Sequence, residues 1–169
     1  MTKAITKRSG TFMAAAALGG LLIPAGAWAG AEGGHHQLAG TWRVSVTTRD
    51  CASGAPLLSF PAMLTFARGG TLTGTTASRA FAPGQRSSDH GVWESTEGGG
   101  FRAVSEAFIL FDSAGTPPAP PLQRGVQRIS QAIEVDGDVF NSNAATEFFD
   151  ASGNVVVTGC ATAVGRRMK

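Results

Sequence analysis

The amino-acid sequence predicts an all-β protein, an eight-stranded antiparallel up-and-down barrel in a single domain. Between residue 38 and the C-terminus, eight short runs of strand-forming residues alternate with turn-forming residues. No segment combines a helical apolar stripe with helix caps. Two cysteines, Cys51 and Cys160, lie near opposite ends of this set of strands. Together these observations predict a meander whose two edges meet.

The first 29 residues are predicted to be a signal peptide. A positively charged start that includes Lys7 and Arg8 precedes the apolar stretch Phe12–Ile23, which is too short to span a bilayer. Ala27-Trp28-Ala29 has the small-x-small pattern of a cleavage site, and cleavage after Ala31 is a close alternative. Residues 30–37 are expected to form a flexible lead-in, and residues 38–169 the barrel.

Removal of the leader changes the charge of the chain. Three of the 14 basic residues lie in the leader and none of the 12 acidic ones does, so the mature chain carries a net charge of −1. It has no basic patch, which argues against a nucleic-acid partner, and no later apolar run of the length that spans a membrane. Because the predicted signal peptide directs export, we expect a protein of the periplasm or the extracellular space.

The first four expected strands follow from alternation and turns. Leu38–Arg49 places Trp42 and every second residue after it on one face, and a proline-bearing connection leads to Ala62–Ala67. Gly69-Gly70 turns the chain into Thr71–Ser78, and the polar stretch FAPGQRSSDH precedes Gly91–Thr96.

The other four strands begin with the longest, Phe101–Asp112, which follows three glycines. A proline-rich loop separates it from Val126–Val135, part of which is also helical by propensity, but the β-branched residues favour a strand. Asp136-Gly137 is typical of a two-residue hairpin turn and leads to Val139–Phe149. The stretch DASGN turns the chain into Val155–Val164.

The two cysteines predict how the sheet closes. In an oxidising compartment a pair of cysteines forms a disulfide by default, and two free thiols are the alternative. A disulfide brings its Cα atoms within about 7 Å, so the first and last strands must be neighbours. If the strands keep the register of Cys51 and Cys160, Val44 pairs with Arg167 and Trp42 lies diagonal to Arg167. Arg166 becomes the partner if a bulge shifts the pairing by one residue.

Gly40, Thr41 and Trp42 at the start of the first strand, with Arg166 or Arg167 in the last, resemble the pattern of the calycins, the lipocalins and their relatives. The resemblance is to a short bacterial barrel of uncharacterised function, because the sequence has no tyrosine and so lacks the Thr-Asp-Tyr signature of typical lipocalins. It implies that the arginine stacks on the indole and plugs one end of the barrel, and that apolar ligands enter at the other end.

An exported barrel that binds a small apolar ligand is the first functional hypothesis, since eight strands enclose room for side chains or one small ligand. The candidate ligand-binding residues were chosen by strand position and apolarity. They are Met63, Phe66, Trp93, Phe108, Phe140 and Phe148. Ser142 and its two flanking asparagines are additional candidates for a cavity wall.

The alternative is a filled barrel that binds another protein, like exported protease inhibitors, through the proline-rich loop Thr116–Pro121 and the lead-in. We expect no enzyme activity, because Ser87, Ser88, Asp89 and His90 are consecutive and a catalytic triad needs groups in line. The glutamates lie on separate strands, where two of them could still meet inside. No cofactor and no metal are expected, since the His35-His36 pair lacks a free amine two residues before it.

Overall fold

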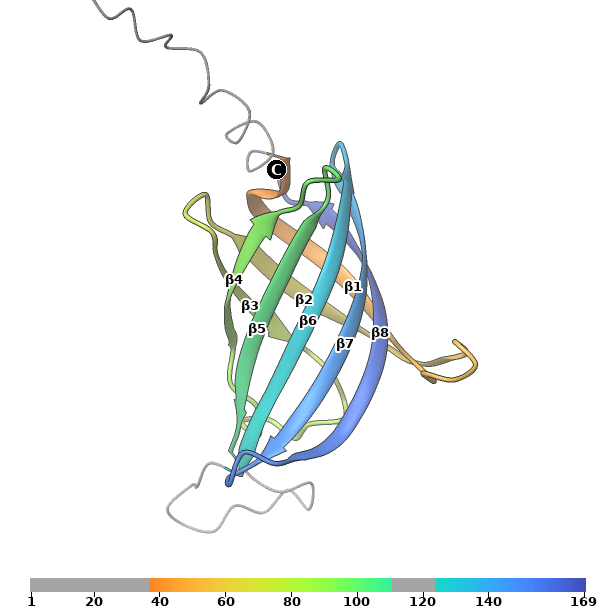
Figure 1. Cartoon of the computed structure of the whole chain (residues 1–169), viewed down its shortest axis with the longest axis vertical. Helices are drawn as coiled ribbons and strands as arrows, with labels where there is room; N and C mark the ends of the chain where they lie inside the picture. The colour runs from red at the N-terminus through yellow and green to blue at the C-terminus, as the bar shows by residue number, and fades with distance from the viewer. Residues whose placement is uncertain (1–36, 111–123) are drawn as a thin grey trace, which may run out of the picture.

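The computed structural model describes residues 37–110 and 124–169, and it shows a closed antiparallel barrel in which every strand pairs with its sequence neighbours and β1 pairs with β8 (Figure 1). The strands are β1 (Gly40–Arg49), β2 (Pro56–Phe66), β3 (Thr71–Thr76), β4 (Asp89–Ser95), β5 (Phe101–Ile109), β6 (Gly125–Asp136), β7 (Val139–Asp150) and β8 (Val155–Arg167). The predicted fold class is confirmed. In the described ranges no helix is long and apolar enough to cross a membrane.

Three sequence-based predictions fall largely or wholly outside the described residues. These are the signal peptide, the lead-in as far as residue 36, and the proline-rich loop Thr116–Pro121.

Strand β2 is longer than predicted, because its prolines lie where they cost no ladder hydrogen bond. The ladder between β2 and β3 ends at Ala62 and Thr76, and one further bond follows it, from Ala77 N to Pro61 O. The nitrogen and carbonyl of one residue point to the same side of an antiparallel strand, so the Pro61 nitrogen faces the β3 side, where the ladder has ended, and takes no place in the β1 ladder. Figure 1 shows the resulting β1–β2 hairpin projecting from the side of the barrel.

One end of the barrel is filled by a cluster of aromatic side chains. The Trp42 and Phe140 rings lie 5.1 Å apart, and the Phe66 ring lies 5.9 Å from Trp93 and 6.2 Å from Phe140, all in edge-to-face geometry. Gly165 stands directly opposite Phe140, and a Cβ at Gly165 would overlap the Phe140 ring. This cluster therefore closes one end of the barrel with packed side chains.

Arg167 covers the Trp42 indole at this closed end. Its guanidinium carbon lies 4.2 Å from the centre of the ring. Nη1 donates to Ala39 O at 2.7 Å, Nη2 donates to Gln37 O, and Nε donates to Asp138 Oδ1 at 3.1 Å. Lys169 and Arg167 together hold the pKa of Asp138 below its ordinary value. The C-terminal end of β8 is thus tied to the segment before β1.

The predicted register between the first and last strands was wrong by two residues. Trp42 pairs directly with Arg167 and Val44 pairs with Gly165, whereas Arg166 pairs with Arg43 on the outer surface. The error has a geometric cause: Cys51 lies in the turn after β1 and belongs to no ladder, so the disulfide does not report the register. In the ladder, Cys160 faces Arg49.

Cys51 and Cys160 form the predicted disulfide across the β1–β8 junction. Their Cα atoms lie 5.3 Å apart and their positions differ by 109 residues. A crosslink of this span removes many conformations from the unfolded chain. The bond therefore reinforces the same closure that Arg167 makes at the other end of β8.

Replacing both cysteines with alanine is expected to lower the free energy of unfolding by up to about 4.7 kcal/mol, the chain-entropy figure for a closed loop of about this length. Denaturant unfolding of the oxidised protein and of C51A/C160A measures the difference. Reductant should destabilise the wild-type protein and leave the double variant unchanged. Equal stability of the two oxidised proteins would contradict the role given to the bond.

Arg167→Lys is expected to lower the free energy of unfolding by about 2 kcal/mol, because lysine has no planar group to stack on Trp42 and cannot serve several acceptors in one plane. The matched control is Arg166→Lys on the outer surface, with an expected change within about 0.5 kcal/mol. Thermal and denaturant unfolding measure both variants. Equal effects at the two positions would contradict the plug.

Candidate functional site

A cavity of about 100 Å³ lies inside the barrel, between the aromatic closed end and the connection from β3 to β4. Val44 and Leu64 line it on the side of the closed end, and Ser78, Phe81 and Arg86 of the connection line it on the other. The volume is far below the roughly 300–1,000 Å³ of sites for drug-sized ligands, and it is comparable with the roughly 150 Å³ cavity that holds benzene. The interior therefore matches a compact molecule.

A buried ion pair forms part of the cavity wall. The Arg86 and Asp89 side chains are only 4% and 6% exposed, and Nη2 of Arg86 lies 2.5 Å from Oδ1 of Asp89. Arg86 Nη1 also donates to Asp89 Oδ2 at 3.2 Å and to Ser87 O at 3.2 Å, and Nε donates to Gln127 Oε1 at 2.5 Å. The two charges cancel locally, so this wall offers polarity without net charge.

The strand registers explain how the ion pair is held. Asp89, Ala107 and Gln127 form one row across β4, β5 and β6, because the register opposes His90 to Glu106 and Ala107 to Gln127. Arg86 contacts both ends of this row, and the small side chain between them leaves it room. The end of β5 is tied to the same connection, since Ser87 N donates to Phe108 O and Leu110 N donates to Gln85 O. The Arg86 side chain therefore rests on three paired strands.

Ser105 lies one row deeper in the barrel than the ion pair. It is 2% exposed, lines the cavity, and has no side-chain hydrogen-bond partner within the described part of the chain. Its neighbour on β4 is Gly91, which has no side chain to cover the hydroxyl, and its neighbour on β6 is Ile129. On β3, which β4 separates from β5, Thr76 Oγ1 is enclosed and likewise has no partner among the described residues. A buried hydroxyl without a partner carries a free-energy cost that a bound polar group can offset.

Three of the six predicted ligand-binding residues lie in the packed closed end. Phe66, Trp93 and Phe140 are buried and contact one another or Trp42 through their rings. Trp93 Nε1 donates to the Ala67 and Thr71 carbonyls. Their side chains fill this end and do not line the cavity.

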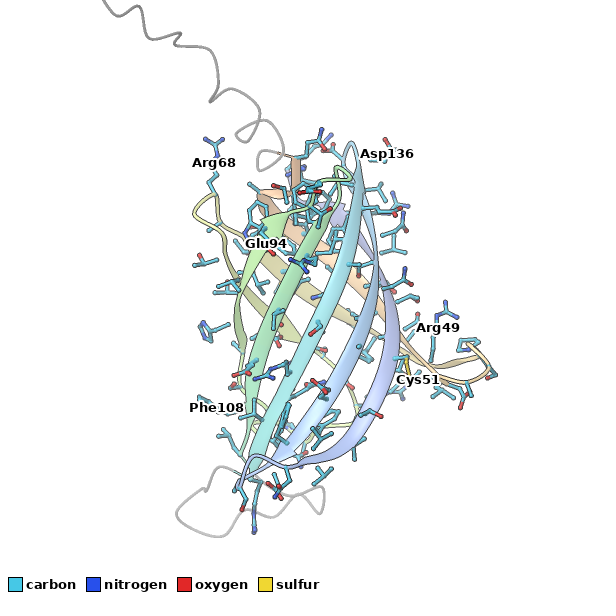
Figure 2. The ribbon with its side chains drawn as sticks, in the orientation of Figure 1. Arg49, Cys51, Arg68, Glu94, Phe108 and Asp136 are labelled. Carbon is cyan, nitrogen blue, oxygen red and sulfur yellow. A yellow bond between two sulfur atoms is a disulfide. The ribbon has the colours of Figure 1, made fainter. Side chains whose placement is uncertain are left out.

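The other three lie elsewhere. Met63 and Phe108 are 49% and 53% exposed on the outer face, and Figure 2 shows Phe108 projecting away from the barrel. Alternate residues of a strand face opposite sides, and the choice of Met63 and Phe108 did not take into account which residues face inward. The inward residues are their neighbours Leu64 and Ala107. Phe148 packs against Phe81, with ring centres 6.3 Å apart, next to the cavity but not in its lining.

The polar residues considered from the sequence separate onto the two faces. Asp89 is buried inside whereas His90 is exposed outside, so the Ser87–His90 run brings no histidine to the interior. Ser142 points inward and donates to Gln131 Oε1 at 3.4 Å, while the asparagines on either side are exposed. Glu94 and Glu106 pair with Arg102 and Arg128 on the outer surface.

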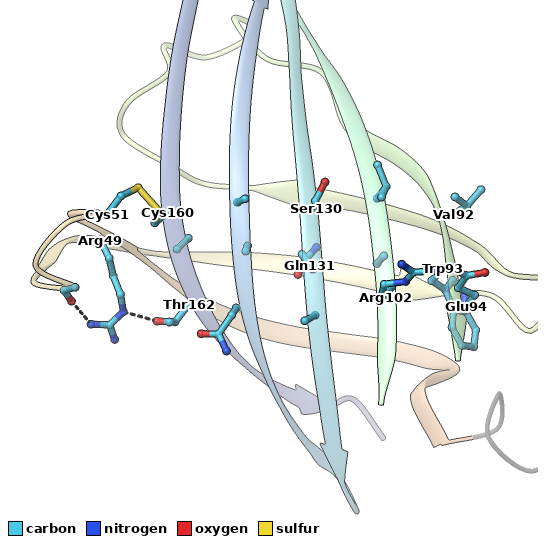
Figure 3. Close-up of a pocket in the computed structure, with 18 of the residues that line it drawn as sticks. Arg49, Cys51, Val92, Trp93, Glu94, Arg102, Ser130, Gln131, Cys160 and Thr162 are labelled. Carbon is cyan, nitrogen blue, oxygen red and sulfur yellow. Dashed lines mark hydrogen bonds and ion pairs between the residues drawn. A yellow bond between two sulfur atoms is a disulfide. The ribbon is translucent and has the colours of Figure 1, made fainter. Parts of the chain in front are cut away.

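A broad groove crosses the outside of the barrel, with a volume of about 950 Å³ (Figure 3). One row of its lining runs across five strands, from Val92 through Val104, Ser130 and Ala145 to Cys160. The projecting β1–β2 hairpin borders it, where Arg49 donates to Thr162 Oγ1 at 2.9 Å and to Gly54 O at 3.0 Å. The groove is open and carries balanced charges, whereas the interior cavity is enclosed.

Sequence reasoning missed the interior roles of Arg86, Asp89, Ser105 and Gln127. Three of these positions could have been found from the alternation of inward and outward residues. Each lies an even number of residues from a large apolar residue of the same strand and so points to the same face: Asp89 to that of Trp93, Ser105 to that of Phe101, and Gln127 to that of Ile133. Arg86 lies in a connection without periodicity, so nothing local pointed to it. In residues 37–110 and 124–169 no group of three or more histidine, cysteine, aspartate or glutamate side chains is arranged to hold a metal ion.

The chain matches no protein-family model, and no curated protein is significantly similar to it. Function is therefore inferred from the geometry of the barrel.

Asp89→Asn is expected to lower the free energy of unfolding by about 3–5 kcal/mol, because it leaves the buried Arg86 guanidinium without a counter-charge. The control is Glu94→Gln, which breaks the exposed pair with Arg102 and should cost less than about 1 kcal/mol. Denaturant unfolding compares the two variants. Equal, small effects would contradict a buried ion pair at the cavity wall.

Proposed function

We propose that this protein is an exported β-barrel that binds a small molecule in its interior cavity. The interior cavity, which is less open than the outer groove, is the observation that carries the proposal, since small-molecule sites are concave and bury most of the ligand's surface. Its wall combines apolar side chains such as Phe60, Leu64 and Ile129 with a few polar groups, as such sites do. The disulfide is consistent with an oxidising compartment.

The size of the cavity limits the ligand. A long-chain lipid does not fit about 100 Å³, whereas a single small ring approaches that size. The ligand we propose is therefore compact, with an apolar body against β1, β2 and β6. The proposed likeness to calycins is supported by the Trp42–Arg167 plug at one end and by the placement of the cavity towards the other.

Binding is proposed in preference to catalysis. Among the residues that the structure describes, Asp89 is the buried carboxylate, and both of its oxygens accept hydrogen bonds from Arg86. A general base needs a carboxylate oxygen that is free to take a proton from the substrate. We therefore propose that Asp89 neutralises and positions Arg86 in the cavity wall and does not act as a base.

Fluorobenzene, observed by fluorine NMR and by thermal shift, tests the proposal. Ala144 and Ala145 are neighbours on β7 that point into the cavity and onto the outer surface respectively. Ala144→Leu fills the cavity and is expected to weaken binding at least tenfold, whereas Ala145→Leu should leave it unchanged. Binding that is absent in the wild-type protein, or equally affected by both substitutions, would contradict an interior site.

A second candidate function is a protein-interaction barrel, and the outer groove is the observation that favours it. Val92 and Val104 are exposed there side by side, and Ala145 lies in the same row. An extended, uncharged peptide segment suits such a groove, because its side chains are small and its charges are balanced. Both alanines border the groove, but the alternation along β7 turns the Ala145 side chain outward and the Ala144 side chain inward. Ala145→Leu should therefore weaken binding in the groove more than Ala144→Leu, whereas Ala144→Leu should weaken binding in the cavity more.

A further inference from the structure

The polar groups of the cavity wall specify the chemical class of the ligand. We infer that it is an uncharged molecule with one hydroxyl, carbonyl or amide group, which hydrogen-bonds Ser105 Oγ next to the Arg86–Asp89 pair. This inference rests on the proposed function and adds to it the polarity, the charge and the anchoring residue of the ligand.

Ser105 is the best anchor because it is buried and still available. Its hydroxyl lies in the cavity wall, has no partner within the described residues, and stands beside Gly91, which leaves it uncovered. A hydroxyl supplies one donor and two acceptor positions, so it can serve a hydroxyl, a carbonyl or an amide. The polar group of a ligand would therefore lie against β5, and its apolar body would lie across the barrel.

The amides of Gln127 and Gln131 flank this position. Both residues line the cavity on β6, and the register puts Ser105 opposite Ile129, midway between them. Each amide oxygen already accepts a hydrogen bond, from Arg86 and from Ser142 respectively. The amide nitrogens are left to donate, so an acceptor on the ligand is better served here than a second donor.

The ion pair excludes charged ligands. A carboxylate ligand would need to take Arg86 from Asp89, which would leave Asp89 buried without a counter-charge. An ammonium ligand would compete with Arg86 for Asp89 in the same way. Because the pair is neutral as a whole, it favours a ligand dipole over a ligand charge.

Phenol and fluorobenzene test the anchor, because they have nearly the same shape and differ in the hydroxyl group. Ser105→Ala is expected to lower the affinity for phenol about tenfold, which corresponds to the loss of one hydrogen bond. The affinity for fluorobenzene should change by less than about twofold. Ser130→Ala, on the outer face of the neighbouring strand, is the matched control and should change neither. Titrations by NMR give the six affinities of the two ligands for the wild-type protein and the two variants.

Isobutyramide and isobutyrate test the charge rule, because they share one shape and differ in charge. The amide is expected to bind the wild-type protein at least tenfold more tightly than the carboxylate. This inference is wrong if isobutyramide and isobutyrate bind equally tightly, or if Ser105→Ala lowers the affinities for phenol and fluorobenzene by the same factor. Neither result would contradict the proposed function. If neither fluorobenzene nor phenol binds the wild-type protein, the proposed function fails and the inference fails with it.

Discussion

The pairing of β1 with β8 is the constraint on which the rest of the molecule depends. Without it the eight strands would form an open meander with two exposed edges, which no neighbouring strand would cover. Two contacts stabilise this closure, one near each end of the β1–β8 ladder. Arg167 of β8 stacks on Trp42 at the start of β1, and the disulfide joins Cys51, in the turn after β1, to Cys160 of β8. An enclosed interior exists only because this ladder forms.

Closure also creates the physical problem that the interior must solve. A barrel of eight strands leaves little space inside, and each polar group placed there must find a partner or carry a cost. The aromatic cluster around Trp42 solves the problem at one end by excluding polar groups. The other end contains the Arg86–Asp89 pair, whose charges and hydrogen bonds satisfy each other, with the hydroxyl of Ser105 next to it. The cavity lies between the aromatic cluster and the Arg86–Asp89 ion pair.

The strand count, the barrel and the disulfide were predictable from the sequence, because periodicity, turns and the presence of two cysteines are local or pairwise properties. An arginine of the last strand was expected beside Trp42, but the sequence left Arg166 and Arg167 both open, and the structure places Arg167 there. The register was not, since Cys51 lies in a turn and a turn residue does not report ladder pairing. The six candidate ligand-binding residues lie outside the lining of the cavity for a different reason. Apolarity identified large side chains, and large side chains either fill the closed end, as Phe140 does, or lie outside on the pleat, as Phe108 does. The cavity is lined by smaller and more polar residues.

The order of the interior rows suggests why the polar groups lie where they do. Gly74 and Gly91 are the inward residues nearest Asp89 on β3 and β4, and their missing side chains make room for Leu64 and for Ser105 respectively. A Cβ at Gly74 would overlap the Leu64 side chain and approach Asp89, and a Cβ at Gly91 would overlap the Val104 carbonyl and Ser105. The two glycines therefore allow Leu64 and Ser105 to pack closely beside the ion pair. A packed apolar core of the same volume would be simpler to stabilise, and this presence of charge and space together is the reason that we propose a ligand for the interior.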